Sequence, residues 1–273
     1  MKMFLRSLRK ARANERLPPG SLTFRCNVCG HDCAARMSEL KREEPSCPSC
    51  GSNVRWRAIV QVLSLNLFGA SLALQDFPAR PDVRGVGLSD WDGYALPLSG
   101  RLDYRNTYFH QEPKLDIRDI PAELEGAFDF VISSEVFEHV PPPVSVAFAN
   151  VRRLLKPGGV LIFTAPYAKH GKTMEHFPEL YDYELAERDG RRVLKNRTRA
   201  GVTQLFESLV FHGGEGETLE MRVFSERDLI EEFERAGFCS VKIYEEPDFE
   251  HGIYWQEDWS LPIAARTPTD EPA

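Results

Sequence analysis

The sequence lacks a long uninterrupted apolar run and has little cysteine outside one short segment. Its longest apolar stretch, residues 58–74, is broken by two polar residues and a glycine, so it predicts a core helix rather than a membrane span. Only six cysteines occur in 273 residues, and no apolar signal segment precedes them, which argues against the disulfide framework of a secreted protein. We therefore expect a cytoplasmic protein whose cysteines stay reduced.

Positive charge is in deficit over most of the chain. Lys and Arg number 34 against 41 Asp and Glu, for a net charge of −7. Residues 1–57 hold 12 basic and 5 acidic side chains, whereas the remainder holds 22 and 36. An acidic body argues against nucleic acid as the main partner. The basic start, Met1 to Arg16, is typical of a solvated tail, with weak contact to an anionic membrane surface as the alternative.

Five of the six cysteines lie between positions 26 and 50. Four of them form two CxxC pairs that are each followed by glycine and are separated by 17 residues. Two such turns can converge on one tetrahedral ion, so the spacing predicts structural zinc, with a redox dithiol as the alternative. The expected ligands are Cys26, Cys29, Cys47 and Cys50. Cys33 and His31 are expected to be bystanders, because four thiolates already complete the shell.

Turn signals divide the chain into parts of unequal size. The segment Leu17-Pro18-Pro19-Gly20 separates a basic tail, residues 1–20, from a zinc ribbon at 21–57. Residues 58–273 are long enough for one well-buried α/β domain. A polar insertion at about 167–222 is expected to build the substrate side of that domain.

Short apolar strands alternate with helices in the larger part. The expected strands are 83–88, 115–117, 128–133, 160–165, 241–244 and 261–265, and the expected helices include 142–155 and one that begins at Ser225. This alternation predicts a doubly wound α/β fold. Its ligand is expected at the carboxyl ends of the strands, near the topological switch point.

Two segments in this domain carry a family resemblance. Phe128 to Val140 reads FDFVISSEVFEHV, and Leu155 to Tyr167 reads LKPGGVLIFTAPY. They closely resemble the fourth and fifth strands of class I S-adenosylmethionine-dependent methyltransferases of the type 11 kind, and the resemblance covers about residues 75–273. It implies a Rossmann-like sheet of seven strands, the last antiparallel, with the cofactor S-adenosylmethionine across the ends of the first four.

The glycine loop of this resemblance departs from the family pattern. The cofactor must approach the first strand closely, which favours Gly85-Val-Gly87 as the loop, with Asp90 at the position of a third glycine. Val83 replaces the usual acidic residue ahead of the glycines. An ordinary turn remains the alternative for this GxG.

Three further positions match cofactor-binding places of the resemblance. Asp116 matches a residue that accepts a hydrogen bond from the adenine amine, and Ile117 is placed to pack on the ring. Glu135 follows the fourth strand, where it can bind the cofactor's amino group or face the substrate, with a solvated helix cap as the alternative. The acid that usually binds the ribose hydroxyls is absent from residues 104–110.

Transfer of the methyl group to a hydroxyl also needs a base. The insertion offers His176, paired with Glu175, as the first candidate and His212 as the second. Aromatic residues in the same part of the chain are available to stack on a sugar ring, with the core as their alternative place. They are Tyr167, Tyr181, Tyr183, Trp255 and Trp259.

The sequence favours one function and leaves two others open. The zinc ribbon together with Leu219-Glu-Met-Arg-Val-Phe-Ser225 and Glu175-His176-Phe-Pro resembles a bacterial group linked with methylation of surface glycans or secondary metabolites. We therefore expect O-methylation of a glycan or a small-molecule hydroxyl. One alternative is an RNA or ribosome methyltransferase whose basic ribbon holds phosphate. The other is a non-enzymatic zinc-ribbon adaptor with a degenerate cofactor fold, suggested by the two missing motifs.

Overall fold

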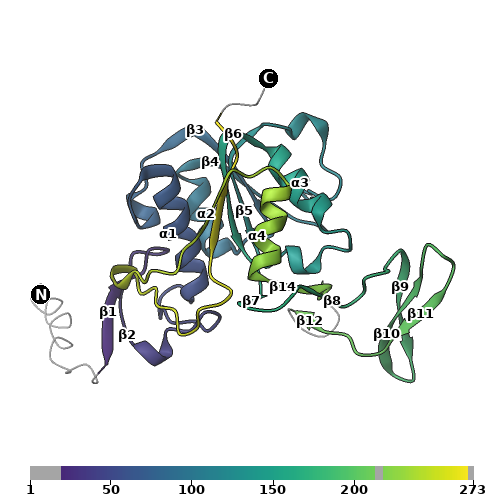
Figure 1. Ribbon diagram of the computed structural model, residues 1–273. Helices are drawn as coiled ribbons and strands as arrows, with labels where there is room; N and C mark the ends of the chain where they lie inside the picture. Colours follow the sequence, from purple (N-terminus) through teal and green to yellow (C-terminus); the bar gives the residue numbers. More distant parts are fainter. Residues whose placement is uncertain (1–19, 213–217, 270–273) are drawn as a thin grey trace, which may run out of the picture.

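The computed structural model describes residues 20–212 and 218–269, so the basic tail lies almost wholly outside the described residues. Its centre is a mixed six-stranded sheet in the order β15-β16-β6-β5-β3-β4 (Figure 1). The strands are β15 (Ser240–Ile243), β16 (Ile263–Arg266), β6 (Leu155–Thr164), β5 (Phe128–Ser134), β3 (Arg80–Leu88) and β4 (Leu102–Thr107). The four strands from β6 to β4 are parallel, and β16 and β15 are antiparallel. The Rossmann-like α/β prediction is therefore confirmed.

The sheet has six strands among the described residues, one fewer than the resemblance implies. The expected strand at residues 115–117 is not formed, because this segment makes only a single parallel bridge, between Tyr108 and Lys114. Pro113 has no N–H to extend a ladder there, and the chain turns immediately afterwards, with the Asp119 N–H bonded to the Asp116 carbonyl. The segment instead lies beyond the end of β4.

The helices follow the predicted pattern with shifted ends. They are α1 (Val54–Phe68), α2 (Asp92–Ser99), α3 (Ser145–Leu154) and α4 (Glu226–Arg235). Asn53 caps α1 by accepting from the Trp56 N–H, and Gly69 ends it at a positive φ of 73°, so α1 starts and stops earlier than expected. The start of α4 is confirmed, since Ser225 accepts from the Asp228 N–H at 3.2 Å.

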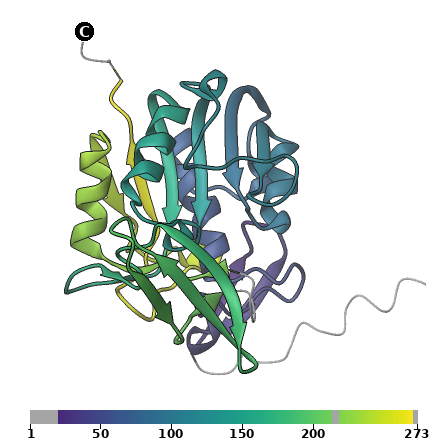
Figure 2. The ribbon, with the colours of Figure 1, turned by 90° about the vertical axis from the view of Figure 1, so that its right-hand side faces the viewer.

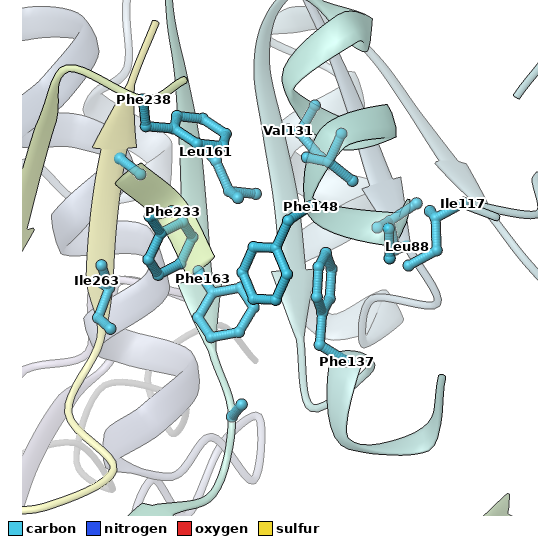
Figure 3. Close-up of a cluster of buried hydrophobic side chains, with 14 of the residues drawn as sticks. Leu88, Ile117, Val131, Phe137, Phe148, Leu161, Phe163, Phe233, Phe238 and Ile263 are labelled. Carbon is cyan, nitrogen blue, oxygen red and sulfur yellow. The ribbon is translucent and has the colours of Figure 1, made fainter. Parts of the chain in front are cut away.

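Both faces of the sheet are covered by apolar layers. On one face, α3 and α4 pack through edge-to-face aromatic rings (Figure 3). Phe148 lies 4.7 Å from Phe137 and 5.1 Å from Phe233, measured between ring centroids. On the other face, α1 and α2 share a second core with the N-terminal residues. Aromatic pairs of this kind add to area burial, which keeps the strand ends in fixed relative positions.

The N-terminal part, residues 21–57, is called the cysteine module below. It consists of the antiparallel hairpin β1 (Ser21–Arg25) and β2 (Asp32–Arg36), a short 3-10 turn (Met37–Glu39), and the loop that leads into α1. Its buried Phe24, Val28 and Leu40 belong to the same apolar cluster as α1 and α2. The module lies at the lower end of the central sheet in Figure 1. It is therefore packed into the core and cannot be removed without opening one face of the domain.

The insertion forms small sheets at the same end of the domain (Figure 2). Its largest part is β9 (Asp182–Arg188), β10 (Arg191–Arg197) and β11 (Thr203–Phe206), an antiparallel arm. The short strands are β7 (Tyr167–Ala168), β8 (Met174–Glu175), β12 (Phe211–His212), β13 (Thr218–Leu219) and β14 (Arg222–Ser225). Short 3-10 turns lie at Leu74–Asp76, Ala122–Leu124, Phe137–His139 and Phe249–His251. Among the described residues, no helix is long and apolar enough to cross a membrane.

Candidate functional site

A cavity of about 1110 Å³ lies at the carboxyl ends of the parallel strands. Ser89 after β3, Tyr108 after β4, Glu135 after β5 and Pro166 after β6 contribute to its floor. The cysteine module supplies one part of the wall, and the insertion supplies another. The structure thus has a large cavity at the place where a doubly wound sheet binds its ligand.

The glycines of the predicted loop face internal packing. A Cβ at Gly85 would lie 2.0 Å from the Phe130 ring, and a Cβ at Gly87 would lie 1.9 Å from the Tyr104 hydroxyl. The Tyr104 and Phe130 rings are themselves stacked, with centroids 5.9 Å apart. Neither glycine lines the cavity, whereas Leu88 and Ser89 at the end of the same strand do. Close packing of two aromatic rings is sufficient to require glycine here.

Asp90 lies in the interior behind this loop. Its carboxylate accepts hydrogen bonds from the hydroxyls of Tyr94, at 2.7 Å, and Tyr104. Asn106 exchanges two hydrogen bonds with the Asp90 backbone. Burial raises the pKa of Asp90 to about 7, against the opposing effect of the two tyrosine hydroxyls. Asp90 is not among the residues that line the cavity, so it can shape the loop without direct contact to a ligand there.

Asp116 and Ile117 do line the cavity, beside the end of β4. The Arg118 N–H donates to Asp116 Oδ1 at 2.9 Å, which holds the carboxylate in a tight turn. In place of the ribose-binding acid, the end of β4 presents Thr107, Tyr108 and His110 to the same space. This end of the cavity therefore combines an acceptor group with an apolar surface, as an adenine ring requires.

Glu135 follows β5 with a positive φ of 55° and is held by two arginines of the cysteine module. Arg42 donates to Glu135 Oε1 at 2.7 Å, and Arg55 Nε lies 4.0 Å from the same oxygen. Burial opposes the charged carboxylate, but the charges of Arg42 and Arg55 outweigh it and lower the pKa of Glu135. All three side chains line the cavity.

Glu220 joins two histidines of the insertion. Its Oε2 lies 2.9 Å from His212 Nε2, and its Oε1 lies 2.8 Å from His176 Nε2. His212 lines the cavity, whereas His176 does not. Glu175 is paired with the buried Arg222, at 2.7 Å, rather than with its neighbour His176. The structure thus brings His212 and His176 together through Glu220 and directs Glu175 elsewhere.

Glu138 and His139 lie beside this group. His139 Nδ1 is 3.0 Å from the Leu219 carbonyl, and burial lowers the pKa of His139. Glu138 is fully buried, neither of its carboxylate oxygens has a hydrogen-bond partner among the described residues, and burial raises its pKa well above the usual range. Glu138, His139 and His212 offer ligand atoms within 4.8 Å of one another, so this group could also hold a cation.

The aromatic residues expected to stack on an acceptor separate into two sets. Tyr183 on β9 and Trp259 line the cavity and are partly exposed. Tyr167 is buried, and its hydroxyl accepts from the Leu261 N–H at 3.1 Å, so it belongs to the core. Tyr181 and Trp255 do not line the cavity.

Four cysteine sulfurs of the cysteine module form a compact group. Cys26 Sγ lies 3.7 Å from Cys50 Sγ, and Cys29 Sγ lies 3.6 Å from Cys47 Sγ. All four lie within 4.8 Å of one another. Zinc–sulfur bonds of about 2.3 Å in a tetrahedron place sulfurs about 3.8 Å apart, so this donor set fits one zinc ion.

The surroundings of the four sulfurs act on them unequally, since burial raises the pKa of Cys29 and raises that of Cys50 to about 12. Burial disfavours the Cys47 thiolate, but the backbone N–H groups of Cys50 and Ser49 donate to it and lower its pKa to about 6. Arg57 is fully buried nearby and bonds the Ser52 and Gly252 carbonyls at 2.9 Å. Cys33 Sγ lies 3.6 Å from Cys47 Sγ and 3.4 Å from the His31 carbonyl, outside the group of four sulfurs.

Sequence reasoning missed Arg42, Arg55 and Glu220 as cavity or near-cavity residues. Arg42 and Arg55 belong to no motif, and each reaches Glu135 across a long separation, which is 93 residues for Arg42. No local pattern in the sequence marks these contacts. For Arg42 and Arg55, the only signal was their charge within a module already singled out by its cysteines.

Comparison with known proteins places most of the chain in one family. Residues 73–243 match a family model described as a methyltransferase domain. Ubiquinone biosynthesis O-methyltransferase of Xanthomonas oryzae pv. oryzae is 38% identical over 71 residues, which are 26% of each chain. The enzyme with the same name from Chromobacterium violaceum is 48% identical over 48 residues, 18% of this chain and 20% of its own. These matches span about a quarter or less of the length of the curated relatives.

Solved structures give weaker matches over a larger part of the chain. A Burkholderia thailandensis 1,6-didemethyltoxoflavin-N1-methyltransferase covers 77% of this chain and 79% of its own, with a TM-score of 0.42 and 16% identity. CalS10 from Micromonospora echinaspora, an amino pentose methyltransferase, covers 69% and 86%, with a TM-score of 0.38 and 18% identity.

Proposed function

The chain belongs to the family of S-adenosylmethionine-dependent methyltransferases, and we propose that it methylates a hydroxyl of a small molecule or glycan. The main support for this proposal is the set of residues that line the cavity. Asp116 and Glu135 lie on its strand-end side, and His212, held by Glu220, lies on its insertion side. One space thus joins residues suited to a cofactor with a base suited to an acceptor hydroxyl.

The strand-end side offers acceptor groups and an apolar surface that suit S-adenosylmethionine. Asp116 would accept from the adenine amine, Ile117 would pack on the ring, and Glu135 would bind the ammonium group. The cofactor supplies a methyl carbon activated by a positive sulfur, so the protein has mainly to align the partners and exclude water. We retain Gly85, Gly87 and Asp90 in the proposal as residues that shape the loop beside the cofactor, because their contacts with Phe130, Tyr104 and Tyr94 fix the chain on both sides of Leu88 and Ser89.

His212 is proposed as the base that takes the acceptor proton. Glu220 orients the imidazole and stabilises its charged form after proton transfer, as a carboxylate does in other histidine pairs. His176 was the first choice from sequence, but it lies beyond Glu220 and not on the cavity wall. We therefore assign His176 and Glu175 positioning roles, His176 through Glu220 and Glu175 through Arg222.

The cysteine module is proposed to bind one structural zinc ion through Cys26, Cys29, Cys47 and Cys50. Four thiolates complete the metal's coordination shell and leave no position for a reacting water. The support is the tetrahedral spacing of the sulfurs and the position of the module within the core.

Asp116→Ala should weaken binding of S-adenosylhomocysteine by about 1–3 kcal/mol, since it removes the proposed partner of the adenine amine. Calorimetric titration would measure this change. Asp119→Ala is the matched control, because Asp119 is an exposed carboxylate three residues away and does not line the cavity. Equal affinities for both variants and the wild type would remove Asp116 from the cofactor site.

The acceptor class can be tested by following the methyl group. The protein would be incubated with S-adenosylmethionine carrying a labelled methyl group and with separated pools of cellular small molecules, glycans and RNA. We expect label in the small-molecule or glycan pool, in a form stable to base as a methyl ether is. Label in RNA alone would support the nucleic-acid alternative, and failure to bind the cofactor would support the adaptor.

A further inference from the structure

Two arginines of the cysteine module reach the cavity, although the module is separate from the strand ends in sequence. Arg42 lies in the loop after the hairpin, and Arg55 lies in the first turn of α1. Their side chains are only 19% and 12% exposed, and both line the cavity next to Glu135. A largely buried pair of guanidinium groups is costly to desolvate unless anionic partners are present.

The partners of these arginines come from three parts of the chain. Glu43 bonds Arg55 at 2.8 Å and also contacts Arg42. Arg42 Nε donates to the Ser260 carbonyl at 2.8 Å, and Arg55 donates to the Ser134 hydroxyl at the end of β5. The side chain of Glu43 is 50% exposed, so its carboxylate can be hydrated if another anion takes its place. Glu135 is only 21% exposed and stays among the positive groups.

The charged groups differ between the two ends of the cavity. At one end, Asp116 follows β4 and offers an acceptor beside apolar Ile117. At the β5 end, Arg42 and Arg55 lie together with two carboxylates, Glu135 and the more exposed Glu43, near the start of α1, where a helix carries partial positive charge. A ligand that combines a carboxylate with an ammonium group on one carbon matches this end, since it needs both signs of charge within a few ångströms.

We propose that Arg42 and Arg55 bind the carboxylate of the cofactor's amino-acid end while Glu135 binds its ammonium group. This inference rests on the proposed function and extends it, because it makes the cysteine module a part of the cofactor site. Arginine is suited to the task, as its planar fork donates two parallel hydrogen bonds to a carboxylate. The module then links metal binding to cofactor binding, since residues 41 and 42 are hydrogen-bonded to the start of α1.

The test compares two ligands that differ only in the amino-acid end. S-adenosylhomocysteine carries it, whereas 5′-methylthioadenosine lacks it. Calorimetric titration would be made with the wild type, Arg42→Ala and Glu135→Gln. We expect both variants to bind S-adenosylhomocysteine about 10-fold to 100-fold more weakly and to bind 5′-methylthioadenosine within about 2-fold of the wild type, as loss of a charge-assisted contact predicts.

Arg36→Ala is the control within the same module. Arg36 is 58% exposed and pairs with Glu39 at the surface, so its loss should change neither affinity. If Arg42→Ala weakens both ligands equally, or neither, the inference is overturned while the proposed function stands. If the wild type binds neither ligand, the proposed function fails and the inference fails with it.

Discussion

The double variant Cys26→Ala/Cys47→Ala is expected to lose its zinc and, with it, the folded state of the cysteine module. The binding free energy of structural zinc is about 10–16 kcal/mol in small zinc domains. The free energy of unfolding of a whole domain is of similar size, about 5–15 kcal/mol. The module shares its core with α1 and α2, so the loss should spread to that face of the sheet. Metal analysis would show less than about half an equivalent of zinc, and thermal unfolding would start at a lower temperature.

Cys33→Ala is the control for this experiment. Cys33 lies 3.6 Å from Cys47 but outside the group of four sulfurs, so the variant should keep one equivalent of zinc. Full zinc in the double variant would reject the four-cysteine site. Loss of zinc from Cys33→Ala would show that the fifth thiol is a ligand. Reversible formation of a disulfide when oxidant is added to wild-type protein that never contained zinc would support the redox dithiol.

The cysteine group could be predicted from sequence because its geometry is local. A CxxC turn followed by glycine fixes the direction of two sulfurs within four residues, and the sequence contains two such turns. The start of α4 at Ser225 is local in the same way, since a cap bonds an N–H three residues away. Features decided within one turn of chain were thus predicted with their residues.

The roles of Gly85 and Gly87 depend on distant residues and could not be predicted. The sequence alone suggested close approach of a cofactor, but the space beside them is filled by Phe130 and Tyr104 from neighbouring strands. Strand order decides which side chains face a glycine, and strand order depends on tertiary packing. The same holds for Asp90, whose tyrosine partners come from α2 and β4.

The missing strand at residues 115–117 has a different cause. Its apolar residues are buried, as a strand would require, yet they pack at the end of β4 without a hydrogen-bond ladder. Burial and strand pairing leave the same apolar pattern in a short segment. Neighbouring Pro113 was the available signal that a ladder could not extend there.

The partners of the two histidines could not be predicted from the sequence either. His176 directly follows Glu175, and this adjacency suggested a pair. In β8, however, Glu175 lies opposite Arg222 of β14, and its carboxylate bonds that arginine. The partner of His176 is Glu220, 44 residues away, which also bonds His212. Two residues that are neighbours in sequence therefore have different partners, and Glu220 links His176 to His212.

His212→Ala should lower turnover by about 100-fold or more while leaving the affinity for S-adenosylhomocysteine near that of the wild type. Loss of a general base has this effect, because the acceptor oxygen must then attack with its proton still bound. His212 is the histidine of the Glu220 group that lines the cavity. Turnover should therefore fall further in His212→Ala than in His176→Ala. Single-turnover assays with the identified acceptor would measure the rates.

Two further variants separate a base from a structural histidine. His170→Ala is the matched control, because His170 is an exposed histidine of the insertion that does not line the cavity. It should keep most of the wild-type rate. Glu220→Gln should slow turnover less than His212→Ala, since it removes orientation and charge but not the base. Added imidazole should partly restore His212→Ala, because a free base can enter the space that the side chain leaves. Wild-type turnover of His212→Ala would reject the assignment, and a larger loss in His176→Ala would return the role to the histidine that the sequence favoured.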